Sequence, residues 1–282
     1  MNYGFEFVLG SEGKIGEVNY SVSGNLTFTQ SRNRYVQSAA FGNSYENWRN
    51  NTNDRNNNIV WMYNAIGQFT SIDQVYRTAV LNGTYNQYDY LPGDIIYEDY
   101  NEDGMIDSWD EQPLRRGSTP VMNYGLSMSA EWKGLDISLA FQGASMFNTS
   151  LSISPLIWSG SAWNIFMDRW HKEDPFDAES PWIAGKYPST RIESPQNYGT
   201  TSTFWYNDCS YLRLKNLEIG YTLPFSWTHF LGVKSLRVYF NGYNLLTWQA
   251  KESNYADPEN PGGQLSSYPI MKNINFGVNV KF

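Results

Sequence analysis

The sequence lacks a long apolar run. No stretch approaches the roughly 20 consecutive apolar residues that a membrane-spanning helix needs, so a helical membrane protein is excluded. Met1 is followed by NYGFEFVLG instead of a basic segment and an apolar core, so no signal peptide is visible. If the protein belongs in an outer membrane, we therefore expect this chain to be a fragment or to have lost its beginning.

Cysteine and histidine are also scarce. Cys209 is the single cysteine and cannot form an internal disulfide, while the two histidines, His171 and His229, lie far apart without metal-ligand neighbours. No nucleophile elbow, phosphate-binding loop or dinucleotide fingerprint is present. Carboxylate pairs suited to glycoside hydrolysis could be drawn only from one acidic segment, whose spacing has another explanation below. The sequence therefore predicts no enzyme.

The chain has few charged residues, and its net charge has the wrong sign for binding nucleic acid. The net charge of -8 argues against a nucleic-acid partner. Charged residues make up 17%, below the roughly one quarter of a soluble domain, and aromatic residues also make up 17%. The mean hydropathy is nevertheless negative, at -0.53. A β-barrel in a membrane explains this combination, because only alternate residues need to be apolar.

The end of the chain shows such an alternation. From Ile274 to Phe282 every second side chain is apolar and the others are Asn, Gly or Lys, which predicts a β-strand with one apolar and one polar face. Six further segments show the same period and are predicted strands: 2–10, 18–28, 122–132, 135–141, 209–223 and 234–248. The apolar phase of 209–223 shifts near Asn216, which predicts a bulge.

The connections alternate between short turns and long excursions. Residues 11–16 and 133–134 are predicted hairpin turns, whereas 31–58 and 145–207 are predicted long loops. This is the layout of outer-membrane barrels, although seven strands are too few and odd in number for a single-chain bacterial barrel. We therefore expect the missing strands upstream of Met1.

Two further segments, one after the first long loop and one within the second, are less defined. Residues 59–72 are apolar and form either an extra hairpin arm or a patch packed inside the loop. After Ser161, side chains at helical spacing predict one short amphipathic helix that stops at Asp174-Pro175. These side chains are Trp163, Phe166, Met167 and Trp170.

The acidic segment 94–111 has the spacing of a calcium-binding loop. Oxygen ligands fall at positions 1, 3, 5, 9 and 12 of the loop pattern, a backbone carbonyl at position 7, and Gly104 at the sharp turn. The predicted ligands of a structural Ca²⁺ are Asp99, Asn101, Asp103, Met105, Asp107 and Asp110. Position 12 is Asp instead of the Glu of an EF-hand. The alternative is an acidic surface loop that uses Asp and Asn for turn chemistry.

Tryptophans in the second excursion are candidate substrate-binding residues. A flat indole suits the apolar face of a sugar ring, and we assign this role to Trp158, Trp182 and Trp205. The alternative is that these rings pack the loops together, and the sequence does not separate the two interpretations. For Trp163 and Trp170, at helical spacing, packing is the better interpretation.

Several long stretches resemble one known family. They are NYGFEFVL, GQFTSIDQV, PGDIIYEDYNEDGMIDSWD, MNYGLSMSAEWKGLDISLAFQG, MDRWHKEDP, KYPSTR, SYLRLKNLEIGYTLP, LRVYFNGYNLLTW and the terminal Phe282. In this order they resemble the C-terminal portion of the SusC/RagA-like TonB-dependent transporters. Such importers pair with SusD-like lipoproteins.

The resemblance implies an all-β fold, an antiparallel transmembrane β-barrel of about 22 strands with long extracellular loops. Residues 1–282 would be its C-terminal portion, without the plug domain and signal peptide. It also implies import of glycan or peptide fragments across the cell outer membrane, with the TonB complex acting through the missing N-terminal region. The side chains of Arg213, Lys215, Asn275, Asn279 and Lys281 would then line the lumen.

A soluble, calcium-stabilised carbohydrate-binding β-sandwich is the alternative. The two folds differ in where the apolar faces point. A sandwich buries them against each other, whereas a barrel wall leaves a continuous outward band.

Overall fold

The computed structural model describes residues 1–81, 89–150, 164–190, 195–250, 257–260 and 270–282. The chain divides into two compact units. The first, here the wall unit, consists of Met1–Asn58, Arg116–Thr149 and Asp208–Phe282. The second, here the loop unit, consists of Ile59–Arg115 and Ser150–Asn207, so two separate insertions build it.

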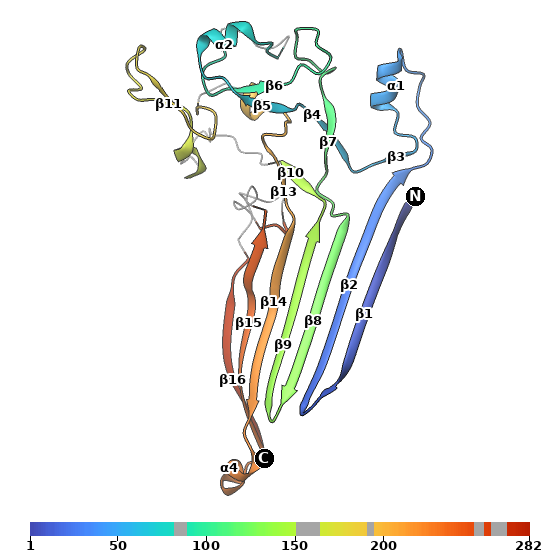
Figure 1. Cartoon of the computed structure of the whole chain (residues 1–282), viewed down its shortest axis with the longest axis vertical. Helices are drawn as coiled ribbons and strands as arrows, with labels where there is room; N and C mark the ends of the chain where they lie inside the picture. Colours follow the sequence, from blue (N-terminus) through green and yellow to red (C-terminus); the bar gives the residue numbers. More distant parts are fainter. Residues whose placement is uncertain (82–88, 151–163, 191–194, 251–256, 261–269) are drawn as a thin grey trace. The chain divides into compact units, whose positions relative to one another are not determined.

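The wall unit is built on one antiparallel sheet, with neighbours in the order β1-β2-β8-β9-β14-β15-β16 (Figure 1). The strands are β1 (Asn2–Ile15), β2 (Val18–Asn33), β8 (Met122–Trp132), β9 (Leu135–Ser145), β14 (Tyr211–Thr222), β15 (Ser235–Gln249) and β16 (Asn273–Lys281). β3 (Arg55–Asn56) pairs with the end of β2. All seven predicted strands are confirmed, and the sheet follows the order of the chain.

One of the two hairpin turns is tighter than the sequence predicts. The predicted turn at 11–16 is wrong, because Ser11–Ile15 continue β1 and pair with β2 as far as Ile15 opposite Val18. The turn is made by Gly16, at φ +61°, and Glu17. The turn between β8 and β9 is at Lys133 and Gly134 as predicted. Both have positive φ, 46° and 88°, which suits the right-handed twist of a hairpin.

The predicted bulge in β14 is confirmed and lies between Leu214 and Asn216. It shifts the alternation by one residue. Leu214 before the bulge and Leu217 after it therefore lie on the same face of the sheet, although they are three positions apart and a regular strand would place them on opposite faces.

Register brings apolar side chains together along one face of all seven strands. Phe5 lies opposite Phe28, with ring centroids 5.5 Å apart, and Phe28 lies opposite Met122. At the other edge Phe240 lies opposite Phe276, with centroids 5.4 Å apart. The members of this apolar band include Phe5, Phe7, Leu9, Val22, Leu26, Phe28, Leu126, Met128, Ile137, Leu139, Leu217, Ile219, Val238, Phe240, Ile274, Phe276, Val278 and Val280.

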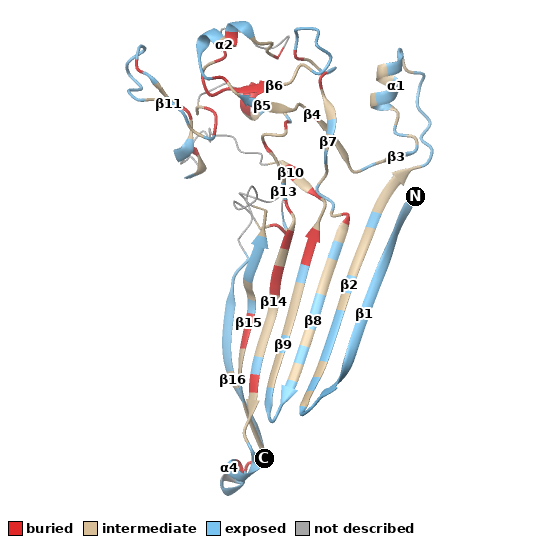
Figure 2. Cartoon of the chain, in the orientation of Figure 1, coloured by how far each residue is buried: buried red, intermediate tan, exposed pale blue. Residues whose placement is uncertain are grey.

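The apolar band is open to the surroundings. Phe276 is 81% exposed and Leu9 67%, and β1 is exposed along its whole length (Figure 2). In the described part of the wall unit no second sheet packs on this face. The β-sandwich alternative is therefore wrong, since a sandwich would bury these side chains, and the open band matches the barrel wall.

Short elements complete the wall unit. The helix α1 (Ser44–Asn50) begins at Asn43, whose side chain accepts the N–H of Glu46. The helix α4 (Phe225–Thr228) and the 3-10 helix η3 (His229–Leu231) fill the connection from β14 to β15. The strands β10 (Asn148–Ser150) and β13 (Tyr206–Asp208) lie where the chain passes between the units.

The loop unit holds the remaining elements. The first insertion gives β4 (Ile59–Met62), β5 (Ala65–Gln68), α2 (Ile72–Arg77), β6 (Ile95–Tyr97) and β7 (Gln112–Arg116). The second gives η2 (Asn164–Asp168), β11 (His171–Lys172), β12 (Trp182–Ile183) and α3 (Pro195–Tyr198). The apolar patch 59–72 thus forms two short strands and the start of a helix. Phe69, Val75, Tyr90 and Ile96 pack together in a small core.

The predicted amphipathic helix is only one 3-10 turn, Asn164–Asp168. Phe166 and Trp170 are buried, as the packing interpretation expects, whereas Met167 is 75% exposed. Trp163 lies outside the described residues. Among the helices that the structure describes, none is long and apolar enough to cross a membrane.

Candidate functional site

The second face of the sheet in the wall unit is polar across all seven strands. Ser138 of β9 lies opposite Ser129 of β8 and Glu218 of β14, and Glu218 lies opposite Asn241 of β15. The residues of β16 expected to line a lumen lie on this face too. Asn275 is opposite Asn241, Asn279 opposite Arg237, and Lys281 opposite Ser235.

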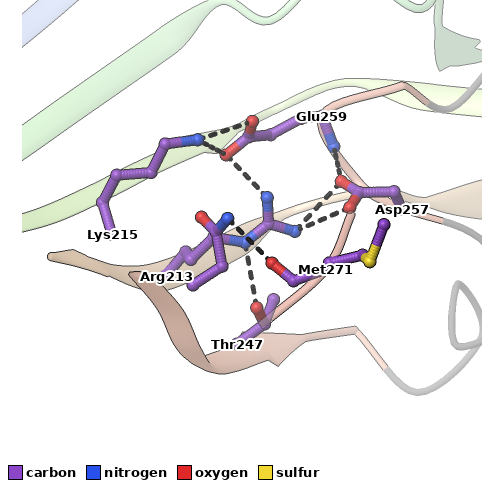
Figure 3. Close-up of polar contacts among 7 residues, drawn as sticks. Arg213, Lys215, Thr247, Asp257, Glu259 and Met271 are labelled. Carbon is purple, nitrogen blue, oxygen red and sulfur yellow. Dashed lines mark hydrogen bonds and ion pairs between the residues drawn. The ribbon is translucent and has the colours of Figure 1, made fainter. Parts of the chain in front are cut away.

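An ion-pair network occupies this face at the β14 bulge (Figure 3). The Arg213 side chain is 3% exposed, and its Nη2 donates to both carboxylate oxygens of Asp257, at 3.0 and 3.1 Å. Its Nε donates to Thr247 Oγ1 at 2.9 Å, and its Nη1 lies 2.9 Å from Glu259 Oε1 without hydrogen-bond geometry. Lys215 Nζ donates to both oxygens of Glu259, at 3.2 and 3.1 Å. This network ties the segment 257–260 to the strands.

A second cluster surrounds Arg237 of β15. Its Nε donates to Asp136 Oδ1 at 3.0 Å and its Nη2 to Glu218 Oε1 at 2.7 Å. The Nδ2 of Asn241 donates to the other oxygen of Glu218, at 3.2 Å. Gly220 makes room for the guanidinium, because a Cβ there would lie 2.3 Å from Nη2. One cation thus holds two carboxylates on the polar face.

The sequence indicated only part of these networks. Arg213 and Lys215 were singled out because they are polar residues at alternate positions of a strand. Arg237 and Asp136 carry the same signal and were missed. Asp257 lies in a Gly/Pro-rich loop, where no periodicity exists to place its carboxylate over β14.

In the loop unit, the two insertions meet at a buried carboxylate. Asp94 has no exposed surface, and its Oδ1 accepts the Nδ2 of Asn197 at 2.9 Å. Its Oδ2 accepts the N–H of Leu91 at 3.0 Å. The Oδ1 of Asn197 in turn accepts the N–H of Ile95 at 3.0 Å. Hydrogen bonds therefore replace the water that this carboxylate loses on burial.

An aromatic cluster lies in the second insertion. Tyr187 and Trp205 stack with centroids 5.9 Å apart, and Tyr198 lies 5.4 Å from Trp205. Trp205 is 4% exposed and its Nε1 donates to the carbonyl of Asn197. These contacts support packing as its role in this conformation. Its sugar-binding role stays a prediction, which would require the ring to leave the cluster.

The other two tryptophans differ. Trp182 is half-buried on β12, and the Lys172 ammonium lies 5.7 Å from its ring centroid. Trp158 lies outside the described residues. The structure therefore does not gather the predicted substrate-binding residues at one place, and the role of Trp182 stays a prediction.

The acidic loop forms turns through its own carboxylates. Asp99 accepts the N–H groups of Asp103, at 3.2 Å, and of Gly104, at 2.8 Å. Asp110 is buried and accepts N–H groups with both oxygens, from Tyr100 at 2.8 Å and from Asp107 at 2.8 Å. Among the described residues, no three His, Cys, Asp or Glu side chains are gathered so that they could hold a metal. Two of the predicted ligands, the Asn101 side chain and the Met105 carbonyl, are not His, Cys, Asp or Glu side chains, so that statement does not apply to them.

Glu98 and Cys209, which lie outside the seven-stranded sheet, have displaced pKa values. Hydrogen bonds from Asn64 and Gln112, both at 2.9 Å, lower the pKa of Glu98. Burial raises the pKa of the Cys209 thiol to about 11. Cys209 is 1% exposed, so it is a protonated packing residue and not a reactive nucleophile.

These features define a class of protein: a segment of antiparallel barrel wall, apolar on one face and polar on the other, carrying a folded loop unit. No family model matches the chain. TonB-dependent receptor P3 of Formosa agariphila is 28% identical over 302 residues, which cover 100% of this chain and 28% of the receptor. TonB-dependent receptor P26 of the same organism is 29% identical over 208 residues, covering 67% of this chain and 20% of the receptor.

Solved structures agree in fold. The RagAB peptide transporter superposes with a TM-score of 0.63 at 19% identity, covering 100% of this chain and 29% of that one. The closed-closed state of the RagAB peptide importer superposes with a TM-score of 0.62 at 18% identity, covering 100% of this chain and 29% of the importer chain. The resemblance to SusC/RagA-like TonB-dependent transporters is thus confirmed, as is the antiparallel barrel fold. This chain spans less than a third of the length of these relatives.

Proposed function

We propose that the chain forms part of the wall and outer loops of a TonB-dependent importer in the cell outer membrane. The observation that carries this proposal is the two-faced sheet. The apolar band would face lipid, and the polar face with the Arg213 and Arg237 clusters would face the lumen. Its curated relatives are named TonB-dependent receptors, which supports transport without catalysis as the function.

The importer would carry glycan or peptide fragments and work with a SusD-like lipoprotein. RagAB, whose fold this chain shares, is a peptide importer, which supports the peptide class. Trp182, which is half-buried on β12, would serve a glycan by stacking. The TonB complex would act on regions of the importer beyond this barrel portion, and the wall strands would cross the membrane several times.

Membrane fractionation of the host tests this proposal. An antibody against residues 270–282 should detect the protein in the outer-membrane fraction, and a deletion strain should lose growth on the glycan or peptide that is imported. Complementation with the intact gene should restore growth. A soluble band near 32.4 kDa, the mass of this chain, would contradict the proposal.

We further propose that Ca²⁺ binds the acidic loop through the six ligands predicted from its spacing, Asp99, Asn101, Asp103, Met105, Asp107 and Asp110. The sharp turn at Gly104, with φ +84°, and the Asp99 bonds to the backbone N–H groups support a loop of this type. Chelator should accelerate proteolysis within residues 94–111 of the intact importer about tenfold or more, and Asp103→Ala should remove the calcium dependence.

Asp177→Ala is the matched control. The Asp177 carboxylate accepts the backbone N–H of Glu179, two residues further on, at 2.9 Å, but Asp177 lies outside the calcium spacing. This variant should keep the full response to chelator. Proteolysis of the wild type that chelator leaves unchanged would contradict the calcium site and favour turn chemistry alone.

A further inference from the structure

Arg213 and Lys215 form a pair of cations on the polar face of β14. Arg213 lies opposite Thr247 of β15 and Gln142 of β9, so strands on both sides hold its backbone, and Lys215 lies at the bulge. The two carboxylates that cover the pair come from the segment 257–260, which is outside the strands. The cations thus belong to the sheet, whereas their counter-ions belong to a loop.

The Arg213 guanidinium has more hydrogen-bond donors than its partners use. Its Nε donates to Thr247, and its Nη2 donates to both oxygens of Asp257. Its Nη1 has no hydrogen-bond partner among the described residues, although the side chain is only 3% exposed. A buried N–H without an acceptor is unfavourable. Nη1 is therefore free to bind one further oxygen with good geometry.

The two loop carboxylates are held unequally. Asp257 receives both bonds from Nη2 of Arg213, and its Oδ1 also accepts the N–H of Glu259 at 2.9 Å. Glu259 lies between Lys215 and Arg213 (Figure 3), bonded only to the lysine, and its Oε1 is 2.9 Å from Nη1 without hydrogen-bond geometry. Lys215 is 39% exposed, and ion pairs so near water contribute little. Glu259 is therefore the carboxylate that exchanges at the lower cost.

The guanidinium would keep its position if Glu259 moved away. The ring of Tyr211 lies 5.7 Å from Arg213 Cζ, and Tyr211 is 6% exposed. Thr247 and Asp257 hold the other donors of the guanidinium. Two cations would then face one carboxylate. A preorganised site with one positive charge in excess is suited to bind an anion.

We propose that Arg213 Nη1 and Lys215 Nζ form a carboxylate-binding subsite, which the chain's own Glu259 occupies until a carboxylate of an imported fragment displaces it. This inference rests on the proposed function and assigns an acidic group to the fragments that pass the polar face. The shared chemistry is a carboxylate, carried by an acidic peptide or by a glycan of uronic acids. Charge-assisted bonds from two cations would hold it.

Binding of two carboxylate probes to the intact importer in detergent tests the subsite. The probes are tetraglutamate, acetylated and amidated at its ends, and trigalacturonate. Each is compared with an uncharged counterpart, the equally blocked tetraglutamine or methyl-esterified trigalacturonate. Glu259→Ala removes the internal competitor, so it should lower the Kd of a carboxylate probe about tenfold or more and leave its counterpart unchanged. The probe that responds assigns the carboxylate to a peptide or to a glycan.

Two further variants separate the subsite from a general effect of charge. Adding Lys215→Gln to Glu259→Ala should return the Kd to the wild-type value or above, because one of the two cations is lost. Glu17→Ala is the matched control, since it also removes a carboxylate from a lysine, Lys133, at 2.6 Å in an exposed ion pair. It should leave the Kd unchanged. Heat-modifiable migration verifies that every variant is assembled.

Hydrogen exchange in the wild type provides a test without substitution. The N–H of Glu259 donates to Asp257 Oδ1, and the N–H of Asn260 donates to the carbonyl of Asp257 at 3.0 Å. A saturating carboxylate probe should speed exchange at these two amides about threefold or more, because the segment loses its tie to Lys215. The uncharged counterpart should leave exchange unchanged.

Three results would overturn a proposal, and they are distinguishable. Equal Kd values of wild type and Glu259→Ala for both carboxylate probes, with unchanged exchange, would make the network a purely structural tie and leave the proposed importer standing. An equal gain in Glu259→Ala and Glu17→Ala would attribute the effect to overall charge and also overturn the subsite. Absence of the importer from the outer membrane would overturn the proposed function itself.

Discussion

Gly93 packs its backbone directly against an indole in the loop unit. A Cβ at this position would lie 2.3 Å from Cγ of Trp170, and φ is +93°, a conformation that glycine adopts without strain. The N–H of Gly93 donates to the carbonyl of Phe69 at 2.7 Å, so the residue cannot move away freely. We predict that Gly93→Ala destabilises the loop unit by about 2 kcal/mol or more, from strain and overpacking together.

Hydrogen exchange at the Phe69 amide, which donates to the carbonyl of Asp94 at 2.9 Å, measures this effect locally. Gly67→Ala is the control, because a Cβ there meets nothing within 4 Å. Its exchange rate should stay within a few-fold of wild type, whereas Gly93→Ala should exchange at least about 30-fold faster. Equal protection in the two variants would mean that Trp170 can move aside at little cost.

Glu98 makes the stability of the loop unit depend on pH. Its pKa is lowered in the folded state by hydrogen bonds from Asn64 and Gln112. The stabilisation is therefore fully present above the pKa of the unfolded carboxyl, and is lost as pH falls from there through the lower folded pKa. We predict that Gln112→Ala lowers the thermal midpoint of the loop unit at neutral pH and shrinks its decrease on acidification. Melting curves from pH 7 to pH 3 measure both, and parallel curves for the two proteins would refute the role of Gln112.

At the scale of the element, the strands could be predicted almost completely and the side-chain networks could not. Alternation of apolar and polar residues is a local property, so β16 and the bulge near Asn216 were visible in the sequence. Which loop residues bond to a strand depends on contacts between residues that are far apart in the sequence. The bonds from Arg213 to Asp257, and from Asn197 to Asp94, therefore had no local signal. The turn at Gly16 was misplaced because Ser11 to Lys14 are polar enough to look like a turn.

The two faces of β16 allow a direct test of the barrel wall. Phe276 and Asn275 are neighbours in the chain, but Phe276 belongs to the apolar band and Asn275 to the polar face. We predict that Phe276→Lys prevents stable assembly in the outer membrane, because a lysine facing the bilayer midplane costs about 2–4 kcal/mol in a barrel. Asn275→Lys should assemble at wild-type levels. Heat-modifiable migration of the intact importer from outer membranes measures assembly, and equal assembly of the two variants would reject a lipid-facing band.

At the scale of the whole molecule, two insertions separated in the sequence form one body. The two insertions are joined in this body, since Asp94 of the first is buried and accepts a hydrogen bond from Asn197 of the second. No local pattern in the sequence indicates that the two segments pack together. Within the wall unit, however, the chain ends that each insertion joins lie together. The N–H of Gly117 donates to Asn58 Oδ1 at 2.9 Å, and the N–H of Cys209 to the carbonyl of Phe147 at 3.2 Å.

This arrangement predicts an unusual order among deletions in the intact importer. Replacing both insertions, residues 59–115 and 150–207, by short Gly/Ser links should leave the wall assembled in the membrane, because short links span the adjoining ends. Replacing only 150–207 should be worse for assembly, since it leaves Asp94 as a buried carboxylate without its Asn197 donor and uncovers apolar surface. Quantifying the heat-modifiable band in outer membranes ranks the variants. The opposite outcome is that the variant lacking only 150–207 assembles better than the double deletion. The first insertion would then fold alone, and the bond between Asp94 and Asn197 would contribute little to holding the two insertions together.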